Sequence, residues 1–162
     1  MDVGCGRGLM MIGAAKRLST GKAVGIDLWS AKDQAANSPE ATLMNARLEG
    51  VEQKISIQTG DARQLPYADD SFDIVMSHWV IHNIEAQADR DKALSEMWRV
   101  LRPGGALLTA DIEFVPAYAQ QLDKLGAKTV NFYDGGREAR IMGILSGGSY
   151  RPQAVIALKA CT

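Results

Sequence analysis

Residues 2–8 read Asp2-Val3-Gly4-Cys5-Gly6-Arg7-Gly8, an acidic residue followed by three glycines at alternate positions. Glycine lets the backbone turn sharply and approach a ligand closely, because no side chain stands in the way. The apolar segment 9–18 that follows predicts a buried helix. The stretch is therefore typical of a strand-to-helix turn that binds a nucleotide-like ligand, although such turns also occur as purely structural features.

Beyond this turn, predicted strands and helices alternate along the chain. Strands are predicted at 23–26, 55–59, 72–76, 106–110, 129–133 and 154–158, and helices at 9–18, 38–50, 88–101 and 116–125. This alternation predicts an α/β fold with a mostly parallel sheet covered by helices on both faces. At 162 residues, 46% of them apolar, the chain fits one domain with a sizeable core.

Several of these segments carry a more detailed expectation. Ser38 is predicted to cap the helix at 38–50, whose apolar residues are Leu43, Met44, Ala46 and Leu48, with Asn45 and Arg47 facing outward. The helix at 88–101 has one apolar stripe, formed by Leu94, Met97, Trp98 and Leu101. Segment 102–105, Arg-Pro-Gly-Gly, is predicted to stop that helix and turn into the next strand. The sequence indicates no clear form for segment 135–149.

Acidic residues stand at the ends of two predicted strands. Asp27 closes the second strand about 20 residues after the glycine turn, the spacing at which an acid reaches ribose hydroxyls. The third strand ends in Gly60-Asp61-Ala62, and the fourth ends in Ser77-His78-Trp79. Both acids have a structural alternative, since Asp27 could cap a turn and Asp61 could be a turn acid after Gly60.

These motifs, together with Ser71–Val75 and Leu101–Gly105, stand in the order and rough spacing of a known family. Over residues 2–111 the chain resembles the class I S-adenosylmethionine-dependent methyltransferases, in particular the ubiquinone and menaquinone biosynthesis type. The resemblance implies a Rossmann-like three-layer sandwich with a seven-stranded sheet and an antiparallel strand near one edge. It also implies S-adenosylmethionine as cofactor and a small-molecule methyl acceptor.

The resemblance implies roles for the glycine turn and its acidic residue. Gly4, Gly6 and Gly8 would let the backbone approach the methionine part of the cofactor. Asp2 would order this loop and its waters.

The strand ends would hold the rest of the cofactor. By the resemblance, Asp27 would accept both ribose hydroxyls in charge-assisted hydrogen bonds. Leu28 would lie against the adenine face, Asp61 would accept from the exocyclic amine, and the backbone of Ala62 would contact the ring edge. Ser77 completes the expected cofactor-binding set.

Both histidines of the chain follow the fourth strand, where the family's acceptor pocket begins. Histidine can take a proton from an acceptor near neutral pH, so His78 and His82 are candidate catalytic residues. The alternative is a polar linker in which a histidine caps a backbone carbonyl. Methyl transfer needs no obligatory base, so neither histidine is indispensable.

Composition excludes several function classes. A net charge of −1 gives no electrostatic footprint for nucleic acid. Cys5 and Cys161 have no metal-type spacing, which predicts no metal and a reduced, cytoplasmic setting. A reactive Cys5 is disfavoured, because a small residue is expected there for packing alone. No signal peptide or membrane-length apolar run is present in this sequence.

Two rival functions remain open at this point. A nicotinamide-dependent oxidoreductase is disfavoured because the turn is Gly-x-Gly-x-Gly rather than Gly-x-Gly-x-x-Gly. The second rival is a non-catalytic cofactor-binding module of the same fold. Only Met1–Val3 precede the glycine turn, so we expect a truncated first strand and one domain, 1–162, that lacks the family's usual N-terminal helices.

Overall fold

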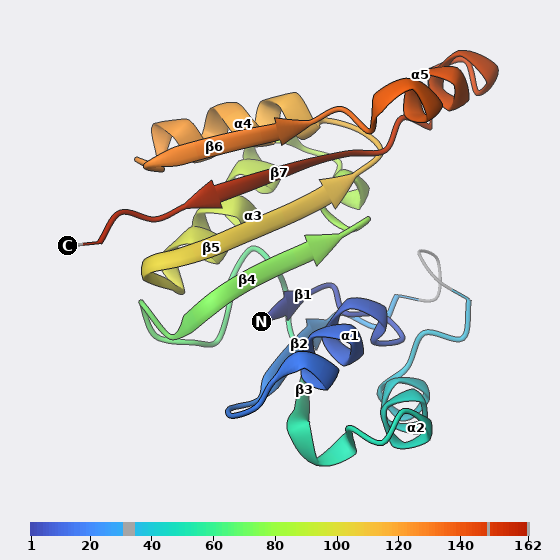
Figure 1. Cartoon of the computed structure of the whole chain (residues 1–162), viewed down its shortest axis with the longest axis vertical. Coiled ribbons are helices and arrows are strands. Elements are labelled where there is room, and N and C mark those ends of the chain that lie inside the picture. The colour runs from blue at the N-terminus through green and yellow to red at the C-terminus, as the bar shows by residue number, and fades with distance from the viewer. Residues whose placement is uncertain (31–34, 149, 162) are drawn as a thin grey trace.

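The structure is a computed structural model that describes residues 1–30, 35–148 and 150–161. Its strands are β1 (Asp2–Val3), β2 (Ala23–Asp27), β3 (Ile55–Thr59), β4 (Phe72–His78), β5 (Leu101–Asp111), β6 (Thr129–Tyr133) and β7 (Gln153–Leu158). They form one seven-stranded sheet in the order β3-β2-β1-β4-β5-β7-β6 (Figure 1). β7 runs antiparallel to both β5 and β6, and the other four pairings among these strands are parallel, which confirms the mostly parallel sheet with an antiparallel strand near one edge.

Helices pack on the sheet and divide the core into two parts. The α-helices are α1 (Leu9–Arg17), α2 (Pro39–Leu48), α3 (Gln87–Arg99), α4 (Val115–Lys124) and α5 (Gly136–Leu145), with short 3-10 helices η1 (Glu52–Lys54) and η2 (Ile81–Asn83). In Figure 1, α1 lies in front of β2, whereas α3 and α4 lie behind β5 and β6. One apolar cluster joins α1 and α2 to β2 and β3, and a larger one joins α3 and α4 to the central strands. This arrangement is the expected three-layer sandwich.

The order in which strands are added to the sheet reverses at β1, although β1 and β4 are parallel. Strands β2 and β3 are added on one side of β1, and β4 and the later strands on the other. β1 is short, as expected, and pairs Asp2 with Gly25 on one side and with Met76 on the other. Ligands of open α/β sheets bind in the crevice at such a switch point, outside the carboxyl ends of the strands.

Segment 102–105 corrects one expectation. The structure places these residues inside β5 rather than in a turn before it, and α3 ends earlier, at Arg99. The pairing of β4 with β5 shifts register between Phe72 and Ile74, so this irregularity takes up the extra residues. Gly104 has a positive φ of 78° and donates its N–H to the Lys159 carbonyl at 3.1 Å. The Pro-Gly-Gly sequence is therefore accommodated within an irregular strand.

The buried side of α2 also differs from the expected one. Ser38 caps this helix as predicted, accepting from the Ala41 N–H at 3.2 Å. Met44 and Leu48 are exposed, however, and the buried residues are Thr42 and Ala46. Thr42 packs against the glycine turn, and Ala46 lies in the apolar cluster formed with α1, β2 and β3.

Segment 135–149, for which the sequence indicated no form, contains α5 at Gly136–Leu145; Ser149 lies outside the described residues. The predicted apolar stripe of α3 is confirmed, since its members are all buried: Leu94, Met97, Trp98 and Leu101. The last of these belongs to β5 rather than to the helix.

Candidate functional site

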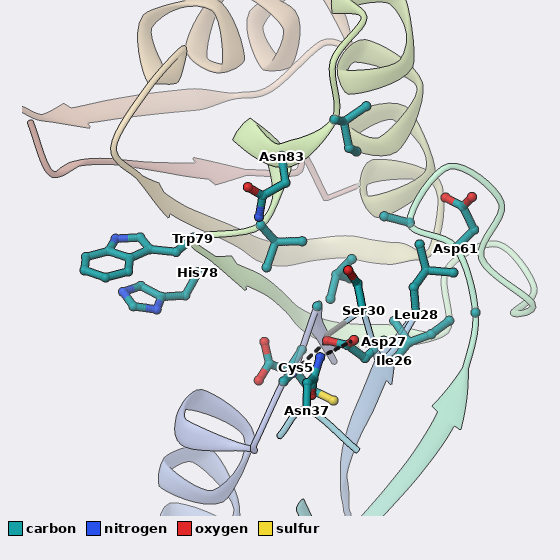
Figure 2. Close-up of a pocket in the computed structure, with 18 of the residues that line it drawn as sticks. Cys5, Ile26, Asp27, Leu28, Ser30, Asn37, Asp61, His78, Trp79 and Asn83 are labelled. Atoms are coloured by element: carbon teal, nitrogen blue, oxygen red, sulfur yellow. Dashed lines mark hydrogen bonds between the residues drawn. The ribbon is translucent and has the colours of Figure 1, made fainter. Parts of the chain in front are cut away.

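A cavity of about 700 Å³ opens at the carboxyl ends of β1, β2 and β4 (Figure 2). Eight of the residues predicted for the site line it: Asp2, Gly4, Gly6, Asp27, Leu28, Asp61, Ala62 and His78. Figure 2 shows Asp61 and Leu28 toward one end of the cavity and His78 with Trp79 toward the other. The topology thus brings together residues that lie far apart in the sequence.

The glycine turn is shaped so that side chains would not fit. Gly4 has a φ of 73°, and a Cβ added there would lie 2.3 Å from Cγ2 of Val80. Gly6 and Gly8 also have positive φ values, of 48° and 90°. Backbone in this left-handed region strongly favours glycine. The conformation therefore favours glycine at all three positions, and at Gly4 close packing against Val80 leaves no room for a side chain.

Neighbouring elements hold the turn in place. Thr42 of α2 donates its hydroxyl to the Gly6 carbonyl at 2.6 Å, and Asn45 donates from Nδ2 to the Arg7 carbonyl at 2.9 Å. Asp2, at the start of the turn, accepts from the Met11 N–H at 3.0 Å and so caps the first turn of α1. The sequence did not reveal the contacts of Thr42 and Asn45, because they depend on how α2 docks.

Asp2 is an unusual carboxyl group because it is almost fully buried. Burial raises the pKa of Asp2 from its ordinary value of 3.8 to about 7, against the opposing effect of the Met11 hydrogen bond. Burial also raises the pKa of the Cys5 thiol. Since the thiolate is the reactive form, this direction supports a packing role for Cys5.

Asp27 organises the centre of the cavity wall. Asp27 as a residue is 9% exposed, and its carboxylate accepts from the Gly6 N–H at 2.8 Å, the Trp29 N–H at 2.6 Å and Asn37 Nδ2 at 3.1 Å. Because Nδ2 of Asn37 faces a carboxylate, its Oδ1 is fixed as the remaining acceptor, and this buried atom has no partner among the described residues. Asn37 also lines the cavity, so it offers a free acceptor beside Asp27 (Figure 2).

Asp61 belongs to a chain of charged residues at the other end of the cavity. Arg63 binds Asp61 with its backbone N–H and its guanidinium, and reaches Asp89 of α3 through Nη1 at 3.1 Å. Hydrogen bonds from Arg63 hold the pKa of Asp61 below its ordinary value. These three residues line the cavity, so the carboxylate of Asp61 is held by Arg63 where a ligand would meet it.

Aromatic rings gather at the opposite end of the cavity. The rings of His78 and Trp79 are stacked, with centroids 5.0 Å apart, and Tyr150 meets Trp79 edge-on at 5.7 Å. Trp79 has a φ of 57°, and its N–H donates to the Ala110 carbonyl at 2.9 Å. A non-glycine residue in this conformation costs about 1–3 kcal/mol, so the surrounding structure holds Trp79 at the cavity.

Three of the predicted site residues lie outside the cavity lining. Gly8 caps α1, and the Ser77 hydroxyl donates to the Val3 carbonyl at 2.9 Å. Nδ1 of His82 contacts the carboxylate of the buried Asp111, which also accepts from the His82 backbone N–H at 3.1 Å. Burial raises the pKa of Asp111, and His82 opposes that effect. His82 therefore faces the end of β5 rather than the cavity.

Among residues 1–30, 35–148 and 150–161, no cluster of three or more His, Cys, Asp or Glu side chains could hold a metal ion. Over the same residues, no helix is both long enough and apolar enough to cross a membrane.

Comparison with known proteins agrees with this geometry. Residues 1–109 match the family model described as "Methyltransferase domain". The methyltransferase GfsG of Streptomyces halstedii is 41% identical over 112 residues, which are 69% of this chain and 37% of the relative. The demethylmenaquinone methyltransferase of Lactobacillus johnsonii is 33% identical over 108 residues, 65% of this chain and 40% of that protein.

The chain thus spans less than half the length of these two curated relatives. In the solved structure of a SAM-dependent methyltransferase from Aquifex aeolicus, the match covers 97% of this chain and 79% of that one, with a TM-score of 0.70 and 16% identity. That likeness shows the shared fold. Together with the family match, it establishes that the chain belongs to the methyltransferase domain family, the class I S-adenosylmethionine-dependent methyltransferases.

Proposed function

We propose that this protein binds S-adenosylmethionine in the cavity beside the glycine turn and transfers its methyl group to a small-molecule acceptor. The observation that carries the proposal is the pair Asp27 and Asn37, which offers unused acceptor positions next to a turn whose conformation favours glycine. S-adenosylmethionine supplies a methyl group on a positively charged sulfur when bound.

The acceptor positions match a ribose diol. An ionised carboxylate has about four lone-pair positions, and three donors already occupy Asp27, which leaves one. The orphaned Oδ1 of Asn37 provides the second. We therefore propose that the two ribose hydroxyls are shared between Asp27 and Asn37, rather than both binding Asp27.

The adenine and methionine ends are proposed on the same grounds. Leu28 lines the cavity with 60% of its surface exposed, which offers an apolar contact for a ring face, and Asp61 offers an acceptor for an amine. Backbone near Gly4 and Gly6 is open to the methionine part, while Asp2 supports the loop from below.

The remaining proposed residues act from around the cavity. Gly8 and Ser77 would support the cofactor by holding α1 and β1, and Ala62 would present its backbone to the ring edge. His78 lines the cavity, so it is the proposed proton acceptor on the substrate side. His82 would be a positioning residue, because its pairing with Asp111 fixes the segment between His78 and the start of α3.

Orientation supplies most of the catalysis in this proposal. Holding the methyl donor in line with a nucleophile can lower a barrier by about 7–11 kcal/mol in favourable cases, without any general base. The near-neutral charge of the chain supports a small-molecule acceptor rather than nucleic acid. Two free cysteines, one buried and one exposed, support a reducing, cytoplasmic location.

Isothermal titration calorimetry with S-adenosylhomocysteine, the demethylated cofactor, tests the cofactor site. We expect one-to-one binding by the wild-type chain and its loss in Asp27→Ala. NADH titrated in parallel tests the oxidoreductase rival. Binding of NADH but not of S-adenosylhomocysteine would overturn the proposal.

A further inference from the structure

We propose that Arg63 is a positioning residue that holds Asp61 so that its carboxylate accepts one donor from a ligand, which makes the site selective for a base carrying an exocyclic amine. This inference rests on the proposed function, since it concerns the adenine end of the same cavity. Arg63 need not touch the ligand; it acts through Asp61.

The contacts of Arg63 occupy most of the Asp61 carboxylate. The backbone N–H of Arg63 donates to Oδ1 at 2.8 Å, and Nη2 donates to Oδ2 at 2.6 Å. Nε lies between the two oxygens, at 3.0 Å from Oδ1 and 3.1 Å from Oδ2. These three donors leave one of about four lone-pair positions for a further donor.

A second carboxylate fixes Arg63 from the other side. Nη1 donates to Oδ2 of Asp89 at 3.1 Å, and Asp89 lies in the first turn of α3. The chain Asp61–Arg63–Asp89 thus joins the end of β3 to the start of α3 along the cavity lining. An arginine suits this place because its planar guanidinium binds two carboxylates in fixed directions, whereas the donors of a lysine ammonium rotate freely.

The oriented acceptor gives a chemical basis for selecting the base. An adenine amine donates a hydrogen bond to the free position of Asp61. Hypoxanthine carries a carbonyl oxygen at the same place, and that oxygen would face the carboxylate with two acceptors opposed. Without Arg63 the Asp61 side chain, 31% exposed, can rotate toward solvent, so the distinction between the two bases should weaken.

The test measures the affinity ratio between two ligands that differ at this one group, S-adenosylhomocysteine and S-inosylhomocysteine. In the wild type we expect S-adenosylhomocysteine to bind at least about tenfold more tightly, as for a hydrogen bond to a charged group. Arg63→Ala should lower that ratio by about fivefold or more, mainly by weakening S-adenosylhomocysteine. Arg63→Lys should restore part of it, because the charge returns without the planar fork.

Arg47→Ala is a matched control. Arg47 makes a similar two-nitrogen contact with Glu52, from Nε at 3.1 Å and Nη2 at 2.8 Å, but neither residue lines the cavity. Its removal should leave the affinity ratio unchanged. A fall in the ratio equal to that of Arg63→Ala would overturn the inference, because it would indicate a general effect of losing a surface ion pair.

A double-mutant cycle separates action through Asp61 from direct contact. If Arg63 acts only through Asp61, adding Arg63→Ala to Asp61→Asn should cause no further loss of S-adenosylhomocysteine affinity. Additive losses would overturn the inference. If wild type binds S-adenosylhomocysteine but Arg63→Ala keeps the full ratio, this inference alone fails; if wild type binds neither ligand, the proposed function fails first.

Discussion

Replacing Asp27 with asparagine should destabilise the fold as well as weaken the cofactor site. The Asp27 carboxylate accepts from three donors, the N–H groups of Gly6 and Trp29 and Nδ2 of Asn37. An asparagine has only one acceptor oxygen, so at least one donor would meet an NH₂ group. Losing one hydrogen bond to a charged group costs about 1.5–3 kcal/mol, and weakening the others brings the expected loss in free energy of unfolding to about 2–4 kcal/mol.

Urea denaturation followed by circular dichroism measures this loss, read from the transition midpoint at an unchanged slope. The control is Asp73→Asn, since the side chain of Asp73 is 81% exposed and pairs with Arg102 at the surface. An exposed pair of this kind contributes about 0–1 kcal/mol. If Asp27→Asn cost no more than the control, the reasoning that Asp27 organises the glycine turn would be refuted.

Three further predictions concern other parts of the site. Gly4→Ala should lower the free energy of unfolding by about 1–3 kcal/mol and weaken S-adenosylhomocysteine binding, because the new methyl group would overlap Val80 at a positive φ. Urea denaturation measures the first effect and calorimetry the second. An unchanged affinity would count against close approach of the ligand to this turn. The pKa of Asp2 is raised to about 7 in the fold, above its ordinary 3.8, so this group's contribution to stability is lost as pH rises from about 4 to about 7. Asp2→Asn should therefore gain stability relative to wild type over the same pH range in urea denaturation, and a constant difference would contradict the raised pKa. His82→Ala should lower the free energy of unfolding by about 1–3 kcal/mol, because the buried Asp111 loses its contact with the imidazole. Turnover should fall more than S-adenosylhomocysteine affinity; equal losses of the two would argue against its positioning role beside His78.

The sequence predicted the fold well wherever local pattern and topology agree. Apolar strands that alternate with helices, and glycine or acidic residues at strand ends, follow from the chain itself. The start of β5 was missed because Pro103-Gly104-Gly105 is typical of a turn. Its place in the sheet depends on an irregular pairing with β4, which no local pattern reports.

The sequence predicted only those cavity-lining residues that lie in the glycine turn or at strand ends. Asp27, Asp61 and His78 follow strands whose carboxyl ends must meet, so their convergence follows from the topology. Asn37 binds Asp27 and Arg63 binds Asp89 through side-chain contacts that depend on how their elements pack, which sequence spacing does not encode.

The turn after β4 illustrates a second limit of sequence reasoning. His82 and Asn83 are neighbours in η2, yet Asn83 lines the cavity while His82 pairs with Asp111. The side to which the His82 side chain points is set by its contact with Asp111, which is buried at the end of β5. A pattern of polar residues in the sequence could not assign the two sides.

Mapping backbone amide shifts of ¹⁵N-labelled protein on addition of S-adenosylhomocysteine tests the location of the cofactor site most directly. The account predicts that the largest changes fall on Gly4, Gly6, Trp29 and Arg63, whose N–H groups lie in the glycine turn or bind the two strand-end acids. The β6 strand, which does not line the cavity, should be unaffected. Saturable binding with changes confined to β6 or α5, and none around Gly6 and Asp27, would contradict the central claim.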